Sequence, residues 1–314
     1  MRNYVLGVRL EETEFIWYNR EWKKWDDAFT HVLTHSLHYG SAVFEEIRCY
    51  NTDKGPAVFR LKDHNERLFR SAEIIGMKNS FTKKEMFEAS KKVITKNNLK
   101  EAYIRPLLFY GYTKMGLDSV GLEAEGMIAA LPWGAYLGEE AKVKGISLKI
   151  SQYSRHFPVP ELNHAKVSGF YANSTLAKMD AIKDGYKEAL MLDLDGNVAE
   201  CTGENIFIVK DKKLITPTTK NALRGITRDS VIEIAKSQGI VVEEKTITKE
   251  ELFGADECFI TGTAAEITPV TSVDGKIISA SVGETTVLVQ KIFEETIHGK
   301  RPEFIDWLDF VDEC

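Results

Sequence analysis

The clearest local signal in this sequence is Leu223-Arg224-Gly225-Ile226-Thr227-Arg228-Asp229. A glycine turn leads into Thr227, which is a good N-cap residue. Residues 228–237 then have the spacing of an amphipathic helix, with Val231, Ile234 and Ala235 facing inward. The start of a helix offers free N–H groups and a partial positive charge, which suits a phosphate. An ordinary capped surface helix explains the same residues, so both interpretations stay open.

A second group of small residues follows a strand predicted over residues 258–261. It reads Thr261-Gly262-Thr263-Ala264-Ala265-Glu266. Small side chains let backbone N–H groups approach a ligand closely. A plain turn is the commoner structure for such a segment, and the segment alone does not separate the two.

Outside these two segments, strands and helices are mixed along the whole chain. Strands are expected at 15–18, 41–50, 103–110, 146–151, 190–194 and 205–209, the last two around the turn Asp195-Gly196. Helices are expected around 67–75 and at 82–95, 171–184 and 284–297, with a Thr82–Glu85 capping box opening the second. The fold class is therefore α+β, with mixed α/β character.

The chain is long enough for two packed domains. Residues 131–144 contain Pro132 and two glycines before a charged stretch, which indicates a linker. We expect a smaller N-terminal α/β domain over residues 1–130. A larger C-terminal domain is expected over 145–314.

Composition narrows the function classes. The 314 residues are 43% hydrophobic and 28% charged, which is typical of a protein with a large core, and the net charge of -6 disfavours nucleic-acid and anionic-membrane partners. The start of the chain lacks the pattern of a secretory signal, and no apolar run approaches the roughly 18 residues of a membrane span. The scattered cysteines, Cys49, Cys201, Cys258 and Cys314, indicate a reducing cytoplasm.

Several common active-site patterns are missing from the sequence. There is no P-loop, no Gly-x-Gly-x-x-Gly and no Gly-x-Ser-x-Gly, which disfavours P-loop, Rossmann and α/β-hydrolase enzymes. His31, His35 and His38 have helical spacing, but nothing nearby completes a metal site, so packing and capping roles are favoured and no metal is expected. Spacing alone does not select a catalytic lysine.

Short motifs in a fixed order supply the missing information. They are His38-Tyr39-Gly40, Phe44-Glu45, Ile47-Arg48, His64-Asn65-Glu66-Arg67-Leu68, Tyr103-Ile104-Arg105-Pro106, Pro132-Trp133-Gly134-Ala135-Tyr136, Gly203-Glu204-Asn205, Gly225-Ile226-Thr227-Arg228 and 262–269. In their order and spacing they resemble the branched-chain amino acid aminotransferases, which belong to the fold-type IV pyridoxal-phosphate enzymes. The resemblance implies pyridoxal 5'-phosphate as cofactor and a two-domain architecture.

The resemblance also implies a cofactor site. Lys166, in His164-Ala165-Lys166, matches the lysine whose amine joins the cofactor aldehyde and later shuttles a proton. Glu200 matches the acid that faces the pyridine nitrogen, and Tyr171 matches the tyrosine at the phenolate oxygen. Phosphate binding is expected from Arg67 and from the segments that contain Leu223, Gly225, Ile226, Thr227, Gly262 and Thr263. Each of these could instead be an ordinary loop, helix or strand-end residue with no role in a cofactor site.

For the substrate, the resemblance implies that Tyr103 and the backbone at Thr263-Ala264 hold the α-carboxylate. Phe44, Trp133 and Tyr136 are expected to wall an apolar pocket, although core packing explains any one of them equally well. Tyr39 and Arg105 are expected to receive the distal carboxylate of glutamate. The family forms homodimers, so at least a dimer is expected, and a loop with Met115 and Leu117 is expected to close over a site.

One departure from the family pattern lies next to the expected substrate pocket. The family usually has Phe-Glu-Gly-Ile-Arg, whereas this chain has Phe44-Glu45-Glu46-Ile47-Arg48. On one strand, Glu46 shares a face with Phe44 and Arg48 and points toward the substrate. It is expected to pair with Arg48 or Arg105, or to bend away, with an altered specificity for amines or basic substrates as the hypothesis.

The function expected from the resemblance is ping-pong transfer of amino groups between leucine, isoleucine or valine and 2-oxoglutarate. Rivals on the same scaffold are a D-amino acid or amine transaminase, an aminodeoxychorismate lyase and a non-catalytic binding protein. Tyr103-x-Arg105 and residues 262–265 favour the branched-chain type over the D-amino acid type. Expected partners are therefore small amino acids and 2-oxo acids, in the cytoplasm.

Overall fold

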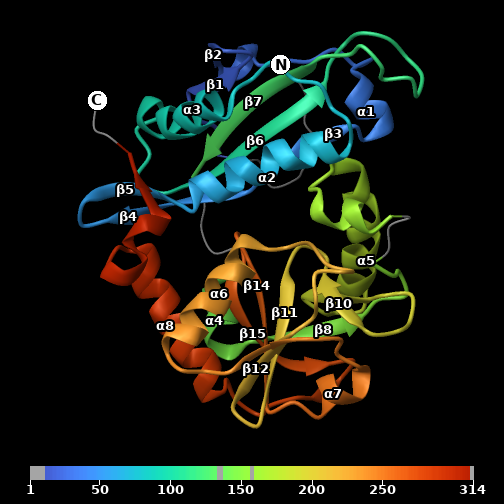
Figure 1. Ribbon diagram of the computed structural model, residues 1–314, viewed down its shortest axis with the longest axis vertical. Helices are drawn as coiled ribbons and strands as arrows, with labels where there is room; N and C mark the ends of the chain where they lie inside the picture. The colour runs from blue at the N-terminus through green and yellow to red at the C-terminus, as the bar shows by residue number, and fades with distance from the viewer. Residues whose placement is uncertain (1–10, 133–136, 156–158, 312–314) are drawn as a thin grey trace.

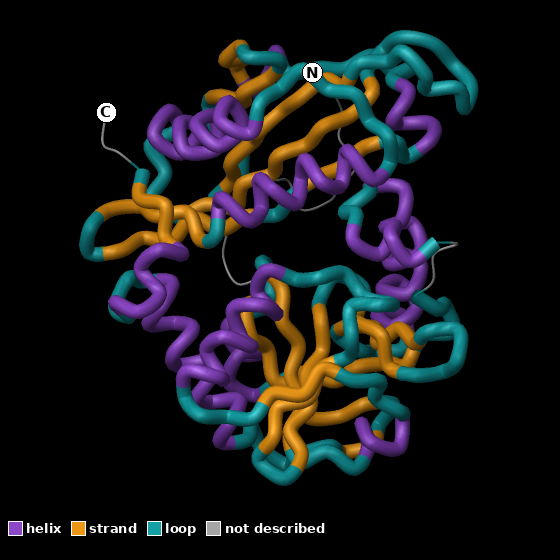
Figure 2. Tube along the Cα trace, in the orientation of Figure 1, coloured by secondary structure: helices purple, strands orange, loops and turns teal. Residues whose placement is uncertain are grey.

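The structure is a computed structural model that describes residues 11–132, 137–155 and 159–311 (Figure 1). Two β-sheets lie one above the other in this view, each with helices beside it (Figure 2). The mixed α and β class expected from the sequence is confirmed. No helix within the described ranges is both long and apolar enough to cross a bilayer.

The first sheet is antiparallel throughout the described residues. Its strands, in spatial order, are β17 (Leu308–Phe310), β5 (Gly55–Phe59), β4 (Ile47–Thr52), β6 (Ala102–Tyr110), β7 (Ala124–Leu131), β1 (Phe15–Tyr18) and β2 (Glu21–Lys24), with β3 (Ala42–Phe44) beside β6. Helices α2 (Leu61–Ile74) and α3 (Lys83–Lys96) cover it (Figure 1). Leu68, Ile104 and Ile128 are fully buried in the core between the sheet and these helices. Because β17 pairs with β5, the end of the described chain returns to this first sheet.

The second sheet mixes parallel and antiparallel pairs. Its order is β10 (Val198–Cys201), β9 (Glu188–Leu192), β8 (Ile146–Ile150), β15 (Glu266–Val273), β14 (Glu257–Gly262), β11 (Asn205–Lys210), β12 (Lys213–Thr216) and β13 (Val242–Glu244), with β16 (Lys276–Ile277) beside β15. Helices α6 (Ile226–Ser237) and α8 (Glu284–Ile297) pack on each other and on β14, and α5 (Tyr171–Lys183) packs on β9. Phe207 and Phe259 stack in its core.

The remaining helices are short. They are α1 (His35–Tyr39), α4 (Glu139–Lys144), α7 (Lys249–Phe253) and the 3-10 turns η1 (Trp25–Asp27), η2 (Pro160–His164), η3 (Ser168–Phe170) and η4 (Pro302–Trp307). The second part of the predicted linker is thus the helix α4, which packs on β15. The division into domains at 131–144 stays a prediction.

Local signals predicted several elements correctly. Helix α8 begins and ends where its periodicity predicted, and the capping box of α3 is present, because Thr82 accepts from the Glu85 N–H at 3.1 Å and Glu85 accepts from the Thr82 N–H at 2.7 Å. The inward face of α6, with Val231, Ile234 and Ala235, is buried as expected.

The strand predicted over 41–50 is wrong at its centre, because β3 ends at Phe44 and β4 begins at Ile47. Pro106 of β6 stands opposite this gap and accepts a hydrogen bond from the Glu45 N–H at 3.0 Å. Since proline has no N–H to return, the ladder is interrupted there. The two glutamates are left outside the regular strands.

Two other local predictions are also corrected. Helix α6 begins at Ile226 with Gly225 as N-cap, so Thr227 lies inside the first turn and is not the cap. The turn at Asp195-Gly196 joins β9 to β10, with Val198 opposite Leu192, and Asn205 begins the next strand. Strand β10 was missed because it is only four residues long.

Candidate active site

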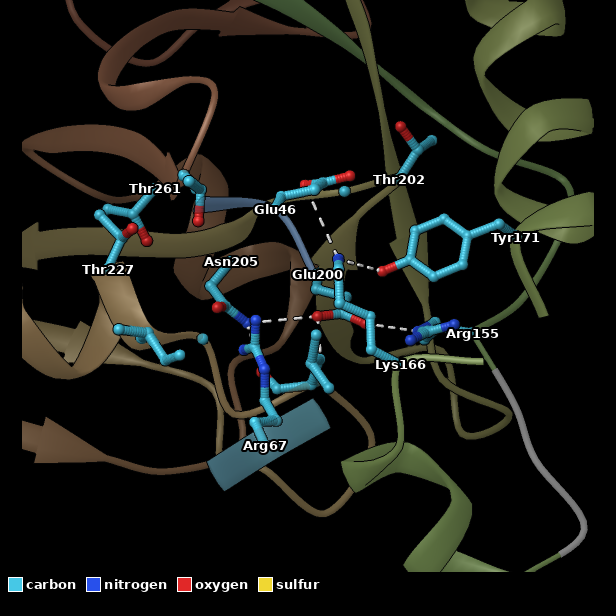
Figure 3. Close-up of a pocket in the computed structure, with 16 residues that line it drawn as sticks. Glu46, Arg67, Arg155, Lys166, Tyr171, Glu200, Thr202, Asn205, Thr227 and Thr261 are labelled. Atoms are coloured by element: carbon cyan, nitrogen blue, oxygen red, sulfur yellow. Dashed lines mark hydrogen bonds and ion pairs between the residues drawn. The ribbon is translucent and has the colours of Figure 1, made fainter. Parts of the chain in front are cut away.

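A cavity between the two sheets is lined by polar residues from both halves of the chain (Figure 3). Its lining consists of Glu46, Arg67, Arg155, Lys166, Tyr171, Glu200, Thr202, Gly203, Asn205, Leu223, Gly225, Ile226, Thr227, Thr261, Gly262 and Thr263. All of the residues expected to hold the cofactor are therefore brought together in one place. They come from segments as far apart as residue 67 and residue 263.

Lys166 lies at the centre of this cavity, and its backbone is fixed on both sides. Its N–H donates to the Ser71 hydroxyl at 3.0 Å, and its carbonyl accepts from the Phe44 N–H at 3.1 Å. The side chain is 4% exposed. Its Nζ donates to the Tyr171 hydroxyl at 2.7 Å and lies 3.7 Å from Glu46 Oε2 (Figure 3).

The surroundings of the amine are charged rather than apolar. Burial alone would lower the pKa of Lys166, but the nearby Glu46 carboxylate and the Tyr171 oxygen outweigh burial and raise it above its ordinary value. Before any ligand reacts with it, Lys166 is therefore an ammonium ion.

Glu200 lies at the end of β10 and is held by three donors. Arg155 Nε donates to one carboxylate oxygen, and the other accepts from Asn205 Nδ2 at 3.2 Å and from the Leu223 N–H at 3.0 Å. The side chain is buried. The donors fix the orientation of the carboxylate, which Figure 3 shows between Arg155 and Asn205.

The start of α6 offers backbone N–H donors to an anion. No side chain caps its first turn, and a Cβ on Gly225 would lie 2.0 Å from Asn205 Oδ1, so the close approach requires glycine. On the same side of the cavity, near Thr227, the buried Thr261 hydroxyl has no hydrogen-bond partner within the described residues (Figure 3). Open N–H groups beside an unpaired hydroxyl fit a phosphate group.

Arg67 of α2 reaches the same end of the cavity. Its Nε and Nη2 donate to Glu45 at 2.6 and 2.8 Å, and its Nη1 donates to the Arg224 carbonyl at 3.1 Å. His64 Nδ1 lies 2.7 Å from the same Glu45 carboxylate, which is fully buried. Burial would raise the pKa of Glu45, but Arg67 and His64 outweigh it and lower the pKa to about 2.

Replacing Glu45 by glutamine is expected to lower the free energy of unfolding by about 3–5 kcal/mol at pH 7, because a buried guanidinium loses its partner. The folded pKa is about 2 against an ordinary 4.5, so the contribution of Glu45 is complete above pH 4.5 and is lost as pH falls toward 2. The difference between wild type and Glu45→Gln should therefore shrink by about 1.4 kcal/mol per pH unit below 4.5. Urea unfolding at pH 7 and 3.5 measures it.

Glu66→Gln is the matched control for this experiment. Glu66 pairs with Lys83, and both side chains are 52% exposed, so its loss should change the free energy of unfolding by less than about 0.5 kcal/mol. Equal effects of the two substitutions would contradict a structural role for the buried carboxylate.

A second cavity of about 310 Å³ opens beside the first, on the side where substrate is expected. It is lined by Glu46, Tyr103, Arg105, Tyr171, Ser174, Thr175, Lys178, Met179, Thr202, Gly203, Glu204, Gly262, Ala264 and Ala265. Phe44 lies beneath it, with Arg105 Cζ and Lys166 Nζ each 4.7 Å from its ring centroid. Tyr103, Arg105, Glu46 and Ala264 are thus placed together as expected.

Thr263 lines the first cavity, and three other expected substrate residues are placed at neither cavity. Trp133 and Tyr136 lie outside the described residues. Tyr39 lines neither cavity, and its hydroxyl accepts from the Gly116 N–H at 3.0 Å. The three histidines have separate partners. His31 Nδ1 accepts from the Leu33 N–H, His38 Nε2 bonds to the Val32 carbonyl, and His35 bonds to the Ser41 hydroxyl and to the Gly116 carbonyl.

Sequence reasoning missed several residues of the site. Asn205 stood inside a quoted motif without a role, and its position at a strand start, two residues after Gly203, was the available signal. Thr261 opened the small-residue segment but was given no role of its own. Arg155 lies in an unremarkable loop 45 residues before Glu200, and no local pattern points to it.

Known proteins provide an independent comparison for this arrangement. Residues 42–273 match the family model of the amino-transferase class IV proteins, which is well over half of the chain. The chain belongs to this family. A branched-chain-amino-acid aminotransferase of Pseudomonas aeruginosa is 46% identical over 297 residues, which cover 94% of this chain and 97% of that aminotransferase.

Two solved aminotransferases have nearly the same fold. The crystal structure of the Escherichia coli branched-chain amino acid aminotransferase has a TM-score of 0.93 at 45% identity, covering 96% of this chain and all of that one. The T.th. branched-chain amino acid aminotransferase, solved with pyridoxamine 5'-phosphate, has a TM-score of 0.92 at 44% identity, covering 96% and 99%. The expected family, the aminotransferase activity and the pyridoxal phosphate cofactor are thereby confirmed.

Proposed function

We propose that this aminotransferase moves amino groups between the branched-chain L-amino acids leucine, isoleucine and valine and 2-oxoglutarate. The observation that carries the proposal is the Lys166 amine in the first cavity, 2.7 Å from the hydroxyl of Tyr171, a residue that lines both cavities. The relatives that cover nearly the whole chain support the same substrate class, since they are named for it.

Pyridoxal 5'-phosphate, when bound, accepts the electron pair that the substrate Cα releases. Lys166 holds the cofactor and carries the proton to and from the substrate Cα. Glu200, oriented by Arg155 and Asn205, holds a proton on the ring nitrogen. The phenolate oxygen is bound by the Tyr171 hydroxyl.

The residues that would bind the cofactor phosphate line the same first cavity. Arg67, the first-turn N–H groups of Ile226 and Thr227, and the Thr263 segment would hold it. Gly225 and Gly262 would let the backbone approach closely, next to Leu223. Glu45 acts through Arg67 as a positioning residue, because it fixes two of the guanidinium nitrogens.

The substrate occupies the second cavity. Tyr103 and the backbone at Thr263-Ala264 bind its α-carboxylate, and Arg105 receives a distal carboxylate. Phe44 provides apolar surface for a branched side chain, and the family resemblance assigns the same role to Trp133 and Tyr136. Tyr39 lines neither cavity, so it would reach a substrate only from a neighbouring subunit. We therefore propose a homodimer, and we propose separately that it acts in the cytoplasm.

An absorption spectrum of the purified holoenzyme tests the function. We expect the visible band of the bound cofactor to bleach on addition of L-leucine and to return on addition of 2-oxoglutarate, as a ping-pong reaction requires. D-leucine is the matched control, because the site is proposed to bind L-amino acids. Bleaching by D-leucine alone would favour the D-amino acid rival, and no bleaching by either would refute both.

A further inference from the structure

Glu46 lines both cavities and places a negative charge where they meet. Its Oε1 lies 3.3 Å from Arg105 Nη2, and its Oε2 lies 3.7 Å from Lys166 Nζ. Its side chain is 23% exposed, so water still reaches it. Burial would raise the pKa of Glu46, but Lys166 and Arg105 outweigh burial and lower it, so the carboxylate is charged at neutral pH.

Some of the cationic side chains near the second cavity are already paired with other groups. Which of them are still open decides where a substrate carboxylate can bind. Lys178 is already engaged with the fully buried Glu188 and with the Lys187 carbonyl. The amine of Lys166 is needed for the reaction. Arg105 is left for a second substrate carboxylate, and 35% of its side chain is exposed to the cavity.

Arg105 is not free, however, because Glu46 already lies against it. Its Nη2 also bonds to the Tyr103 hydroxyl, and its guanidinium lies over the rings of Phe44 and Tyr103. The face of the guanidinium is therefore covered by rings, and one of its nitrogens is shared between Tyr103 and Glu46. A substrate carboxylate must compete for the N–H groups that Glu46 contacts.

We propose that Glu46 is a built-in competitor for Arg105 and thereby a specificity-determining residue. Its carboxylate takes the place that the second carboxylate of a dicarboxylic substrate must take. Dicarboxylic acids bind only after Glu46 moves away from Arg105, whereas monocarboxylic apolar substrates bind without displacing it. The inference rests on the proposed function, since it concerns the same substrate cavity.

The local backbone allows such a movement. Glu46 lies in the gap between β3 and β4, outside the regular hydrogen-bond ladder. Its contact with Arg105 is at 3.3 Å, longer than the 2.6 and 2.8 Å contacts that fix the neighbouring Glu45. After Glu46 has moved, its negative charge still repels the second carboxylate of a dicarboxylic acid nearby. Binding of dicarboxylic acids therefore stays weakened.

Binding of two non-reacting acids to the holoenzyme tests the proposal. Dissociation constants for glutarate, a dicarboxylate, and 4-methylvalerate, a monocarboxylate, are measured by isothermal titration calorimetry in wild type, Glu46→Gln and Glu46→Gly. We expect the ratio of the glutarate constant to the 4-methylvalerate constant to fall by about tenfold or more in both variants. An unchanged or increased ratio in either folded variant overturns the proposal.

Glu21→Gln is the matched control, since it removes one exposed carboxylate that pairs only with Lys23 in the described structure. Its ratio should equal that of wild type, and a fall there as well would assign the effect to net charge and overturn the proposal. If one Glu46 variant fails to fold, the other decides the result. Failure of the proposed function is visible separately, because a holoenzyme that does not respond to leucine still reports the two dissociation constants.

Discussion

Replacing Lys166 by alanine is expected to lower kcat for the leucine half-reaction by at least about 10³-fold. The substitution removes the amine that lies 2.7 Å from the Tyr171 hydroxyl and the group proposed to move the proton at the substrate Cα. Stopped-flow absorbance with L-leucine measures the rate. Exogenous methylamine should restore part of it, which a merely structural defect would not permit.

The chemical identity of the attachment point gives an independent check on Lys166. Borohydride reduction of the holoenzyme followed by peptide mapping should label position 166 in wild type and leave it unlabelled in Lys166→Ala. A label on another lysine, or wild-type turnover in the alanine variant, would remove Lys166 from the mechanism. The variant should keep its fold, because its backbone contacts to Ser71 and Phe44 do not involve the side chain.

The second large effect is expected at Glu200. Glu200→Gln keeps the shape of the side chain but removes the charge that faces the proposed ring nitrogen, and kcat should fall by about 10²–10³-fold. The same leucine half-reaction measures this change. Glutamine also turns one oxygen into a donor that opposes Arg155 or Asn205, so cofactor affinity should weaken as well.

Glu200→Asp separates charge from shape. It keeps the carboxylate at a shorter reach, and it should retain more activity than Glu200→Gln if charge is the main contribution. Equal losses in the two variants would assign the effect to geometry alone. A glutamine variant with wild-type kcat would contradict a role for Glu200 in the reaction.

Sequence patterns predicted the parts of this structure that depend on neighbouring residues. The capping box at Thr82 and Glu85 and the limits of α8 follow from local hydrogen bonding and helical periodicity. The cofactor residues were predicted through their resemblance to a family, and they do line one cavity. Their chemical roles stay proposals.

The rest depends on contacts between distant segments, which no local pattern contains. The break between β3 and β4 arises because Pro106 stands opposite Glu45, and the pairing of these strands is known only after folding. Arg155 reaches Glu200 across 45 residues. The charged environment of Lys166 likewise follows from Glu46, whose distance to the amine could not be read from the sequence.

The first cavity is built from both halves of the chain, with Arg67 of α2 on one side and Thr227 of α6 and Thr261 of β14 on the other. A molecule held by all of these groups ties the two halves of the protein to each other. By mass action it stabilises the folded protein more strongly as its concentration rises. The vitamin supply of the cell would then govern how long each copy survives proteolysis as well as how many copies are active.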